Sequence, residues 1–368
     1  MIILLKQNLQ ARFYRVSAKA HLTVPQELHD IILGSMLRNK KYLNLKTYST
    51  KQNLDINVSS SQASLPRLNP WWVTGFLDAE SSFKVGIYKS DKMKIGWRIT
   101  TEFSLELHIK DLELLNRIKL FFGSVGQIYI GKTRNTAAFR ISSTKDLLTS
   151  LVPHLLEYPL LTKKRADFLL FKSILELINQ KEHSSTEGFN KILKLKASLN
   201  KGLSEELKKS FPLIIPVERP VVENENIKDP NWVVGFIDGE SCFYVEITES
   251  KTKIKKQVRI KLMIAQHIRD FELIKSFIEI FNCGYTKLDS KNLNIVYYYV
   301  TSFQDIQKNI LPFFNLYPLQ SEKRLDYINF VNVANLMENE KHLTIEGFNE
   351  ILIIKSKMNR INSKNTGA

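Results

Sequence analysis

Cysteine, acidic side chains and long apolar runs are scarce in this chain of 368 residues. Its two cysteines, Cys242 and Cys283, are too few for a disulfide framework, and their neighbours lack the spacing of a metal-binding cluster. No run of about 18 apolar residues is free of charged side chains, so we expect no membrane span. These absences favour a globular protein of a reducing compartment over a secreted, disulfide-rich or membrane protein.

The shortage of acids gives the chain a strong positive charge. There are 37 Asp and Glu against 53 Lys and Arg, and the formal net charge is +16. A field of this sign attracts polyanions, with nucleic acid ahead of an anionic membrane surface. Organellar and ribosome-associated proteins are also basic for general reasons, so the charge indicates a class of partner without locating its binding site.

Acids are absent from the first 26 residues, which contain four basic side chains. This composition is typical of a mitochondrial presequence and equally of a basic, disordered lead-in. Apolar residues over 24–39 have helical spacing, whereas a serine-rich stretch precedes Pro66. We expect residues 1–66 to form a partly disordered N-terminal appendage.

Nearly everything after Pro70 occurs twice, at an offset of 159 or 160 residues. The stretch PWWVTGFLDAESSF at 70–83 matches PNWVVGFIDGESCF at 230–243. Three shorter matches follow: His-Ile-x-Asp at 108–111 and 267–270, Tyr-Pro-Leu with a later Lys at 158–164 and 317–323, and Glu-Gly-Phe-Asn at 187–190 and 346–349. Such a tandem duplication predicts two similar domains, at 67–200 and 230–361, with a linker at 201–229 and a tail at 362–368.

Each copy predicts the element order αββαββα. In the first copy we expect helices over 71–81 and 111–122, strands over 82–89, 96–108, 126–132 and 137–143, and further helices near 145–156, 163–180 and 186–200. Apolar and polar residues alternate along the strands, and the connections between them are short. The pattern indicates an α+β domain with an antiparallel sheet and helices on one face.

The sheet face turned away from the helices carries polar, aromatic and basic side chains. This mixture can hydrogen-bond to base edges in a major groove, although an exposed sheet is also polar for solubility alone. We predict that double-stranded DNA contacts this face. Its residues are Lys84, Gly86, Tyr88, Arg98, Thr100, Glu102, Ser104, Glu106, Gln127, Tyr129, Arg140 and Ser142 in the first copy, and Tyr244, Glu246, Thr248, Gln257, Arg259, Lys261, Met263, Tyr285, Lys287, Tyr297, Tyr299 and Thr301 in the second.

The repeated helix ends in an acid in both copies, Glu80 and Glu240. Two carboxylates beside a phosphodiester would repel it unless a divalent metal ion lies between them. Mg²⁺ binds through one or two carboxylates while keeping water and phosphate oxygens. The alternative is an ordinary core helix that happens to end in Glu, and the duplication favours a shared metal site over it.

Four other residues of the repeated helices have a predicted structural role. Gly75 and Gly235 are small enough to let two backbones approach. Asp78 and Asp238 lie two residues before the final acids and therefore point to a different side of the helix. We predict that these two acids cap a neighbouring helix and that all four residues belong to an interface between the repeated helices.

Two repeated lysines, Lys164 and Lys323, follow the Tyr-Pro pairs at the start of a helix. A lysine there can stabilise charge on a phosphate or polarise a water molecule. Because further basic residues adjoin both lysines, a solvated basic helix start is the alternative. We expect His108 and His267 to be cap or core residues rather than bases.

The doubled pattern Trp-x-x-Gly-Phe-x-Asp-x-Glu-Ser-x-Phe, with His-Ile-x-Asp and Tyr-Pro-Leu-x-x-x-Lys, resembles the LAGLIDADG homing endonucleases over about residues 70–360. The similarity is to their single-chain, two-repeat form, which organellar introns encode. It implies two pseudo-twofold-related domains whose motif helices pack side by side. It also implies two saddle-shaped sheets that each lie in the major groove of a DNA target.

The resemblance also implies the chemistry. Glu80 and Glu240, with Ala79 and Gly239 beside them, would bind Mg²⁺ or Mn²⁺. Lys164 and Lys323 would belong to the basic shell around the hydrolytic waters. The implied enzyme is a monomer of the mitochondrial matrix, encoded in the organelle, that cuts both strands across the minor groove and leaves 3′ overhangs. Some members of the family instead, or additionally, act on their own intron RNA as splicing maturases.

Two features depart from the family pattern. Ser81 and Ser241 stand where a glycine usually follows the catalytic acid, which puts the cleavage rate in question. Residues 31–37 resemble a truncated first motif of another branch of the family, with a chance helix as the alternative.

Overall fold

The computed structural model describes residues 67–251 and 254–358. The predicted appendage with its truncated motif (1–66) and the predicted tail (362–368) lie outside the described residues. Among the residues described, no helix is both long enough and apolar enough to cross a membrane.

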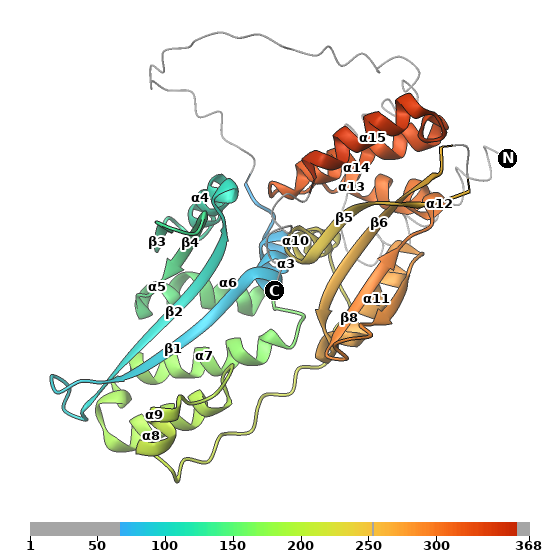
Figure 1. Ribbon diagram of the computed structural model, residues 1–368. Helices are drawn as coiled ribbons and strands as arrows, with labels where there is room; N and C mark the ends of the chain where they lie inside the picture. Colours follow the sequence, from blue (N-terminus) through green and yellow to red (C-terminus); the bar gives the residue numbers. More distant parts are fainter. Residues whose placement is uncertain (1–66, 252–253, 359–368) are drawn as a thin grey trace, which may run out of the picture. The chain divides into compact units, whose positions relative to one another are not determined.

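The first half of the structure is an antiparallel sheet preceded by one helix (Figure 1). Its elements are α3 (Pro70–Glu80), β1 (Ser81–Lys89), β2 (Trp97–His108), α4 (Leu112–Phe121), β3 (Gln127–Ile130) and β4 (Thr136–Ile141). The strand order is β1-β2-β4-β3, and all neighbouring strands are antiparallel. The predicted α+β class and sheet type are confirmed.

The second half repeats this arrangement. Its elements are α10 (Pro230–Glu240), β5 (Ser241–Glu249), β6 (Lys256–His267), α11 (Phe271–Phe281), β7 (Tyr285–Leu288) and β8 (Ile295–Val300). The strand order β5-β6-β8-β7 is that of the first sheet, again antiparallel throughout. The duplication seen in the sequence is therefore a duplication of topology.

Helices follow each sheet, and one of them differs from the prediction. They are α5 (Thr144–Asp146), α6 (Val152–Glu157), α7 (Lys164–Asn179) and α8 (Thr186–Ser198), and in the second half α12 (Phe303–Asp305), α13 (Leu311–Leu316), α14 (Lys323–Glu338) and α15 (Ile345–Lys357). The continuous helix expected near 145–156 is widened to a π-helix over Leu147–Leu151. Pro153 lies two residues after its end, and the proline ring leaves no N–H for an α-helical bond. The second half shows the same widening over Ile306–Ile310, before Pro312.

The predicted linker packs on the first half. It contains a short helix, α9 (Glu205–Ser210), whose Ser204 hydroxyl accepts the backbone N–H of Leu207. Beyond it, the Arg219 guanidinium donates two bonds to the carboxylate of Asp167 in α7, at 2.8 and 2.9 Å. The domain division at residues 200 and 230 stays a prediction.

Helices α3 and α10 start at a capped proline and become buried at once. Asn69 caps α3, its side chain accepting the N–H of Trp71, and Asp229 caps α10 in the same way through Asn231. The seven residues from Trp72 to Asp78 are all buried, as are their counterparts in α10. Each helix is therefore covered on several sides rather than along one stripe, which is typical of a helix in the middle of a protein.

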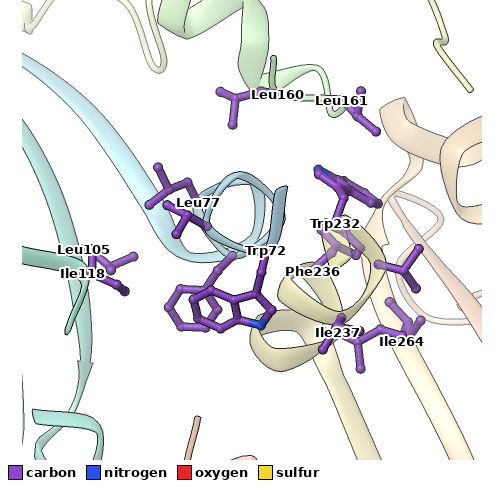
Figure 2. Packing of buried hydrophobic residues seen from close by; sticks show 14 of the residues in the cluster. Trp72, Leu77, Leu105, Ile118, Leu160, Leu161, Trp232, Phe236, Ile237 and Ile264 are labelled. Atoms are coloured by element: carbon purple, nitrogen blue, oxygen red, sulfur yellow. The ribbon is translucent and has the colours of Figure 1, made fainter. Parts of the chain in front are cut away.

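The two buried helices pack directly on each other at their glycines. A Cβ added to Gly75 would overlap the carbonyl oxygen of Trp232, and one added to Gly235 would overlap that of Trp72. Figure 2 shows Trp72 and Trp232 at this junction, with Leu105 on the side of the first sheet. Only glycine allows so close an approach of the backbones, so these two residues set the distance between the helices.

Candidate active site

The structure brings Glu80 and Glu240 together at the carboxyl-terminal ends of α3 and α10. A Cβ added to Gly239 would lie 3.1 Å from Cγ and 3.3 Å from Oε1 of Glu80, so this side chain rests against the residue before Glu240. Burial raises the pKa of Glu80. Burial, followed by the negative charge of Glu80, raises the pKa of Glu240 to about 7. The site therefore holds two acids that repel each other in a poorly hydrated position.

Lys164 and Lys323 are the first residues of α7 and α14, and both reach the ends of the acidic helices. The Lys164 Nζ donates to the carbonyl oxygens of Leu77 and Ala79, both at 3.2 Å. The Lys323 Nζ donates to the carbonyls of Ile237 and Gly239, at 3.2 and 2.8 Å. The last carbonyls of a helix have no intrahelical donor and attract cations, which explains this placement.

Burial lowers the pKa of both lysines, and the acids of the site oppose that shift. Glu80 and Glu240 both act on each lysine, so the four groups form one electrostatic cluster. The alternative of a simply solvated helix start does not describe Lys164 or Lys323. A solvated position does describe Arg324, the exposed residue that follows Lys323 in the sequence.

Asp78 and Asp238 bind backbone and do not face the acid pair. Asp78 accepts the N–H groups of Leu161 and Thr162, at 2.8 and 3.3 Å, and the Thr162 hydroxyl at 2.6 Å. Asp238 accepts the N–H of Gln320 at 2.8 Å in the equivalent way. Burial raises the pKa of Asp78 to about 6. These bonds hold the turns that lead into α7 and α14, and the capping role stays a prediction.

The same aspartates also join the two helices. The Trp232 indole Nε1 donates to Asp78 Oδ2 at 3.0 Å, and the Trp72 Nε1 donates to Asp238 Oδ2 at the same distance. Each bond connects one half of the chain to the other. The tryptophan of each motif therefore hydrogen-bonds to the aspartate of the other motif. Its apolar neighbours in the sequence do not indicate this polar contact.

Sequence reasoning missed Gln266, which lies in β6 beside the acid pair. Its Nε2 donates to Glu240 Oε1 at 3.3 Å. Leu105 in β2 pairs with Ser81 as Ile264 in β6 pairs with Ser241, so these two residues are equivalent. Two residues further along the strands, Leu107 is therefore the counterpart of Gln266. The two acids therefore differ in their surroundings. The signal that could have identified Gln266 was that this position is polar in the second copy and apolar in the first.

The serines after the two acids fit without backbone strain. Ser81 and Ser241 have φ values of −86° and −92°, in the extended region that any residue adopts. The Ser81 hydroxyl donates to the carbonyl of Leu77 at 2.6 Å and so helps to close α3. A glycine is not required by the backbone at these positions.

The strand register gathers the predicted DNA-contacting residues on one face of each sheet. Directly opposed residues share a face. Such pairs are Lys84 with Glu102, Gly86 with Thr100, Tyr88 with Arg98, Gln127 with Arg140, Tyr244 with Lys261, Glu246 with Arg259, Thr248 with Gln257, Tyr285 with Tyr299 and Lys287 with Tyr297. Glu106 lies opposite Ala138, and Met263 opposite Tyr299.

Three residues of that prediction differ from the rest. Ser104 lies on the same face opposite Arg140 but is only 4% exposed. Its predicted contact with DNA is not supported by exposure and stays a prediction. Ser142 and Thr301 are exposed but follow the last residues of β4 and β8, outside the ladders.

Ion pairs and stacked rings organise this face. Glu102 lies 3.4 Å from Lys84 Nζ and 3.8 Å from an Arg140 nitrogen, and Lys261 Nζ lies 2.7 Å from Glu246. In the second sheet the rings of Tyr297 and Tyr299 stack with centroids 5.4 Å apart, and the Tyr285 ring lies tilted against Tyr299 at 5.7 Å. Glu102 and Glu246 are thus paired with cations, while many basic and aromatic groups remain accessible.

The acid pair fits a hard divalent ion that keeps most of its own water. Within 67–251 and 254–358, no group of three or more His, Cys, Asp or Glu side chains could hold a metal ion. Two carboxylates are nevertheless enough for Mg²⁺ when water and phosphate oxygens complete the shell. The Ala79 and Gly239 carbonyls each accept one lysine bond and retain a second lone pair for a cation.

A stability measurement tests the raised pKa of Glu240. The pKa of about 7 in the folded protein exceeds the 4.5 of a free glutamate, so this group costs stability as the pH rises from 4.5 to 7. In urea unfolding with EDTA, Glu240→Gln is expected to match the wild type at pH 4 and to be more stable by roughly 2–3 kcal/mol at pH 8. Glu205→Gln, on the exposed helix α9, is the control. An equal gain at both pH values would contradict the assignment.

The model of the LAGLIDADG endonuclease family matches residues 73–175 and 233–334, once in each repeat. The chain belongs to the LAGLIDADG endonuclease family. The resemblance stated from the doubled motifs is confirmed, including its two-repeat form. In each repeat the matched residues run from the acidic helix to the helix that carries the repeated lysine, Lys164 or Lys323.

Curated relatives are intron-encoded. Two proteins of Neurospora crassa, named probable intron-encoded endonucleases 3 and 2, are 38% and 40% identical over 300 and 301 residues. These alignments cover 80% and 79% of this chain but 55% and 65% of the relatives, so the chain spans about half to two thirds of their length. A protein in ND4 intron 1 of Podospora anserina is 36% identical over 133 residues, 36% of this chain and 29% of that protein.

Solved structures of similar proteins include DNA. I-SmaMI bound to uncleaved DNA target in the presence of calcium ions has a TM-score of 0.77 and 43% identity, covering 79% of this chain and 99% of that chain. The I-SmaMI LAGLIDADG homing endonuclease bound to cleaved DNA has a TM-score of 0.78 at 43% identity, covering 79% and 97%. The predicted architecture of two LAGLIDADG domains is confirmed by these likenesses.

Proposed function

We propose that this protein is a site-specific homing endonuclease that hydrolyses both strands of a long DNA target with Mg²⁺ or Mn²⁺. One observation carries the proposal: the repeated acids Glu80 and Glu240 converge at the ends of paired helices, where the charge of Glu80 opposes the ionisation of Glu240. A protein keeps two repelling carboxylates together at a cost, and binding a divalent cation offsets that cost. The solved I-SmaMI complexes, with calcium and with cleaved DNA, support the same reading.

The residues of the site have complementary tasks in this proposal. Glu80 and Glu240, with the Ala79 and Gly239 carbonyls, would hold the metal. Mg²⁺ bound there would supply positive charge to the phosphate and lower the pKa of a water molecule. Lys164 and Lys323 place a second source of positive charge near the developing charge on the phosphate. Gln266 orients the Glu240 carboxylate through its 3.3 Å bond.

The two sheets supply the target recognition. Their accessible faces present the paired polar, basic and aromatic side chains of β1, β2, β5 and β6 to base edges in the major groove, one sheet on each side of the cut. The net charge of +16 supports binding to the backbone and makes the affinity dependent on salt. With the acid pair between the sheets, we infer cleavage across the minor groove that leaves 3′ overhangs.

One chain supplies both halves of the proposed site, so we infer a monomer. The intron-encoded relatives, among them a protein of an ND4 intron, point to an origin in a fungal mitochondrial genome. We therefore propose the mitochondrial matrix as its location.

Binding of intron RNA stays a prediction. Exposed lysines on the helical side, Lys194, Lys201 and Lys209, offer positive charge away from the sheets. A splicing assay of the host intron with and without the protein tests it. Splicing that proceeds equally in both would eliminate this activity.

A cleavage assay tests the proposed endonuclease. The substrate is a duplex containing the exon junction of the gene without its intron, since a homing enzyme spares the interrupted allele. With Mg²⁺ we expect one double-strand cut at the junction and an intact duplex when EDTA replaces the metal. A junction that is bound but never cut with Mg²⁺ or Mn²⁺ would overturn the proposal.

A further inference from the structure

The repeated His-Ile-x-Asp motif has no task in the proposed chemistry, and its two polar residues do different things. The histidines act locally: His108 Nδ1 accepts the N–H of Lys110, and His267 Nδ1 accepts the N–H of Arg269, at 3.2 and 3.1 Å. They cap the short 3₁₀ turns after β2 and β6. They are caps, as predicted.

The aspartates of the same motif reach into the opposite half. Asp111 Oδ1 accepts the N–H of Glu322 at 2.8 Å, and Asp270 Oδ1 accepts the N–H of Lys163 at 2.7 Å. These bonds span 211 and 107 residues of sequence and are related by the same duplication. Asp270 is only 2% exposed. A buried carboxylate that accepts a backbone N–H is a strong, charge-assisted contact.

Each of these N–H groups immediately precedes an active-site lysine. Lys163 comes before Lys164, and Glu322 before Lys323. Neither Lys163 nor Glu322, which stand at the cap positions of α7 and α14, forms a side-chain cap bond. Helix starts favour a nearby carboxylate, and here the opposite half supplies it.

The start of α7 is therefore held by acids of both halves. Asp78, from its own half, takes the N–H groups of Leu161 and Thr162, and Asp270, from the other half, takes the next one. The start of α14 is held in the same way by Asp238 and Asp111. Three successive donors leave each lysine little freedom to move away from the carbonyls it binds.

We propose that Asp111 and Asp270 are positioning residues that hold the active-site lysine of the opposite half, Asp111 for Lys323 and Asp270 for Lys164. The inference rests on the proposed endonuclease function. Asp270 ends the short 3₁₀ turn, Ile268–Asp270, that follows β6 of the second sheet, so the end of that strand sets the position of the lysine in the first half. The lysine of each half is then held in place only when the other half packs against it. Cleavage of both DNA strands therefore depends on the assembly of the two halves.

Lysine reactivity in the full-length protein tests the crossed arrangement without relying on cleavage. The protein is treated briefly with an amine-acylating reagent, and labelling of Lys164 and Lys323 is quantified by mass spectrometry. Asp270→Ala is expected to raise the labelling rate of Lys164 by about fivefold or more, with Lys323 unchanged. Asp111→Ala is expected to do the reverse. The size follows from the loss of one buried, charge-assisted hydrogen bond at the helix start.

The asparagine variants make the test robust. Asp270→Asn and Asp111→Asn keep an acceptor oxygen, so they are expected to give the same crossed pattern with a smaller rise, about twofold. They also decide the question if the alanine variants do not fold. A rise at the lysine of the variant's own half, an equal rise at both lysines, or no rise in any variant would overturn the inference.

Single-turnover cleavage adds the functional consequence. If the wild type cuts its target, Asp270→Ala is expected to slow cleavage and to have little further effect when Lys164→Ala is already present, whereas its effect persists beside Lys323→Ala. The opposite dependence would overturn the inference. If the wild type cuts no DNA, the proposed function fails, and the labelling pattern still decides whether the aspartates hold the opposite lysines.

Discussion

Glu240→Gln is expected to lower the rate of double-strand cleavage by at least about 10³-fold while DNA affinity is retained. Glutamine has the shape of glutamate but carries no charge, so it preserves packing against Gln266 and removes the main reason for a cation to bind. The sheet faces that we propose contact DNA are unaffected, because the acid lies at the end of α10 and not on those faces. Glu80→Gln is expected to behave in the same way.

Single-turnover kinetics on a labelled duplex, with a parallel gel-shift titration, measure the two quantities separately. Glu205→Gln on α9 is the control for the substitution itself and should cleave like the wild type. Undiminished cleavage by both active-site variants would remove these acids from the chemistry. Loss of binding in step with cleavage would assign them to DNA affinity.

Gly235→Ala is expected to lower the free energy of unfolding by more than about 4 kcal/mol. An added Cβ would overlap the carbonyl oxygen of Trp72 and lie 2.8 Å from the backbone nitrogen of Phe76. Backbone of a buried helix cannot move aside locally, so the two helices must separate. Separation lengthens the reciprocal bonds between the tryptophans and the aspartates and opens the packed junction between the halves.

Urea unfolding measures this loss, and Gly123→Ala provides the matched control. Gly123 has φ of +77°, so alanine is strained there, but no atom lies within 4 Å of the added Cβ. Strain alone is expected to cost about 1–2 kcal/mol. A loss at Gly235 no larger than that at Gly123 would show that the helices are not in the close contact described.

The sequence predicted the sheet faces well because strand geometry is periodic. Side chains alternate between two faces, so once the buried residues of β1 and β2 were identified, the opposite set had to share the other face. Burial depends on neighbours as well as on this alternation, so the alternation did not show that Ser104 is buried. Pro153 likewise has the pattern of an ordinary first-turn proline, and the sequence did not indicate the π-helix over Leu147–Leu151 that precedes it.

The duplication predicted the candidate site in part. It identified Glu80 and Glu240 as a pair because both copies keep an acid at the same position, and it separated them from Asp78 and Asp238 by helical geometry. It did not reveal Gln266, because comparison of the copies draws attention to what they share and this residue is where they differ.

What the sequence by itself determined is the set of local features: repeat, element order, capped helix starts, and alternating faces, all of which depend on residues close together in the chain. Only the tertiary structure decided which groups meet across the two halves. Asp111 and Asp270 hold the helix starts of the opposite half, through contacts 211 and 107 residues apart in the chain. Spacing within one copy carries no record of such contacts, because they form only when the glycines of α3 and α10 let the two halves dock.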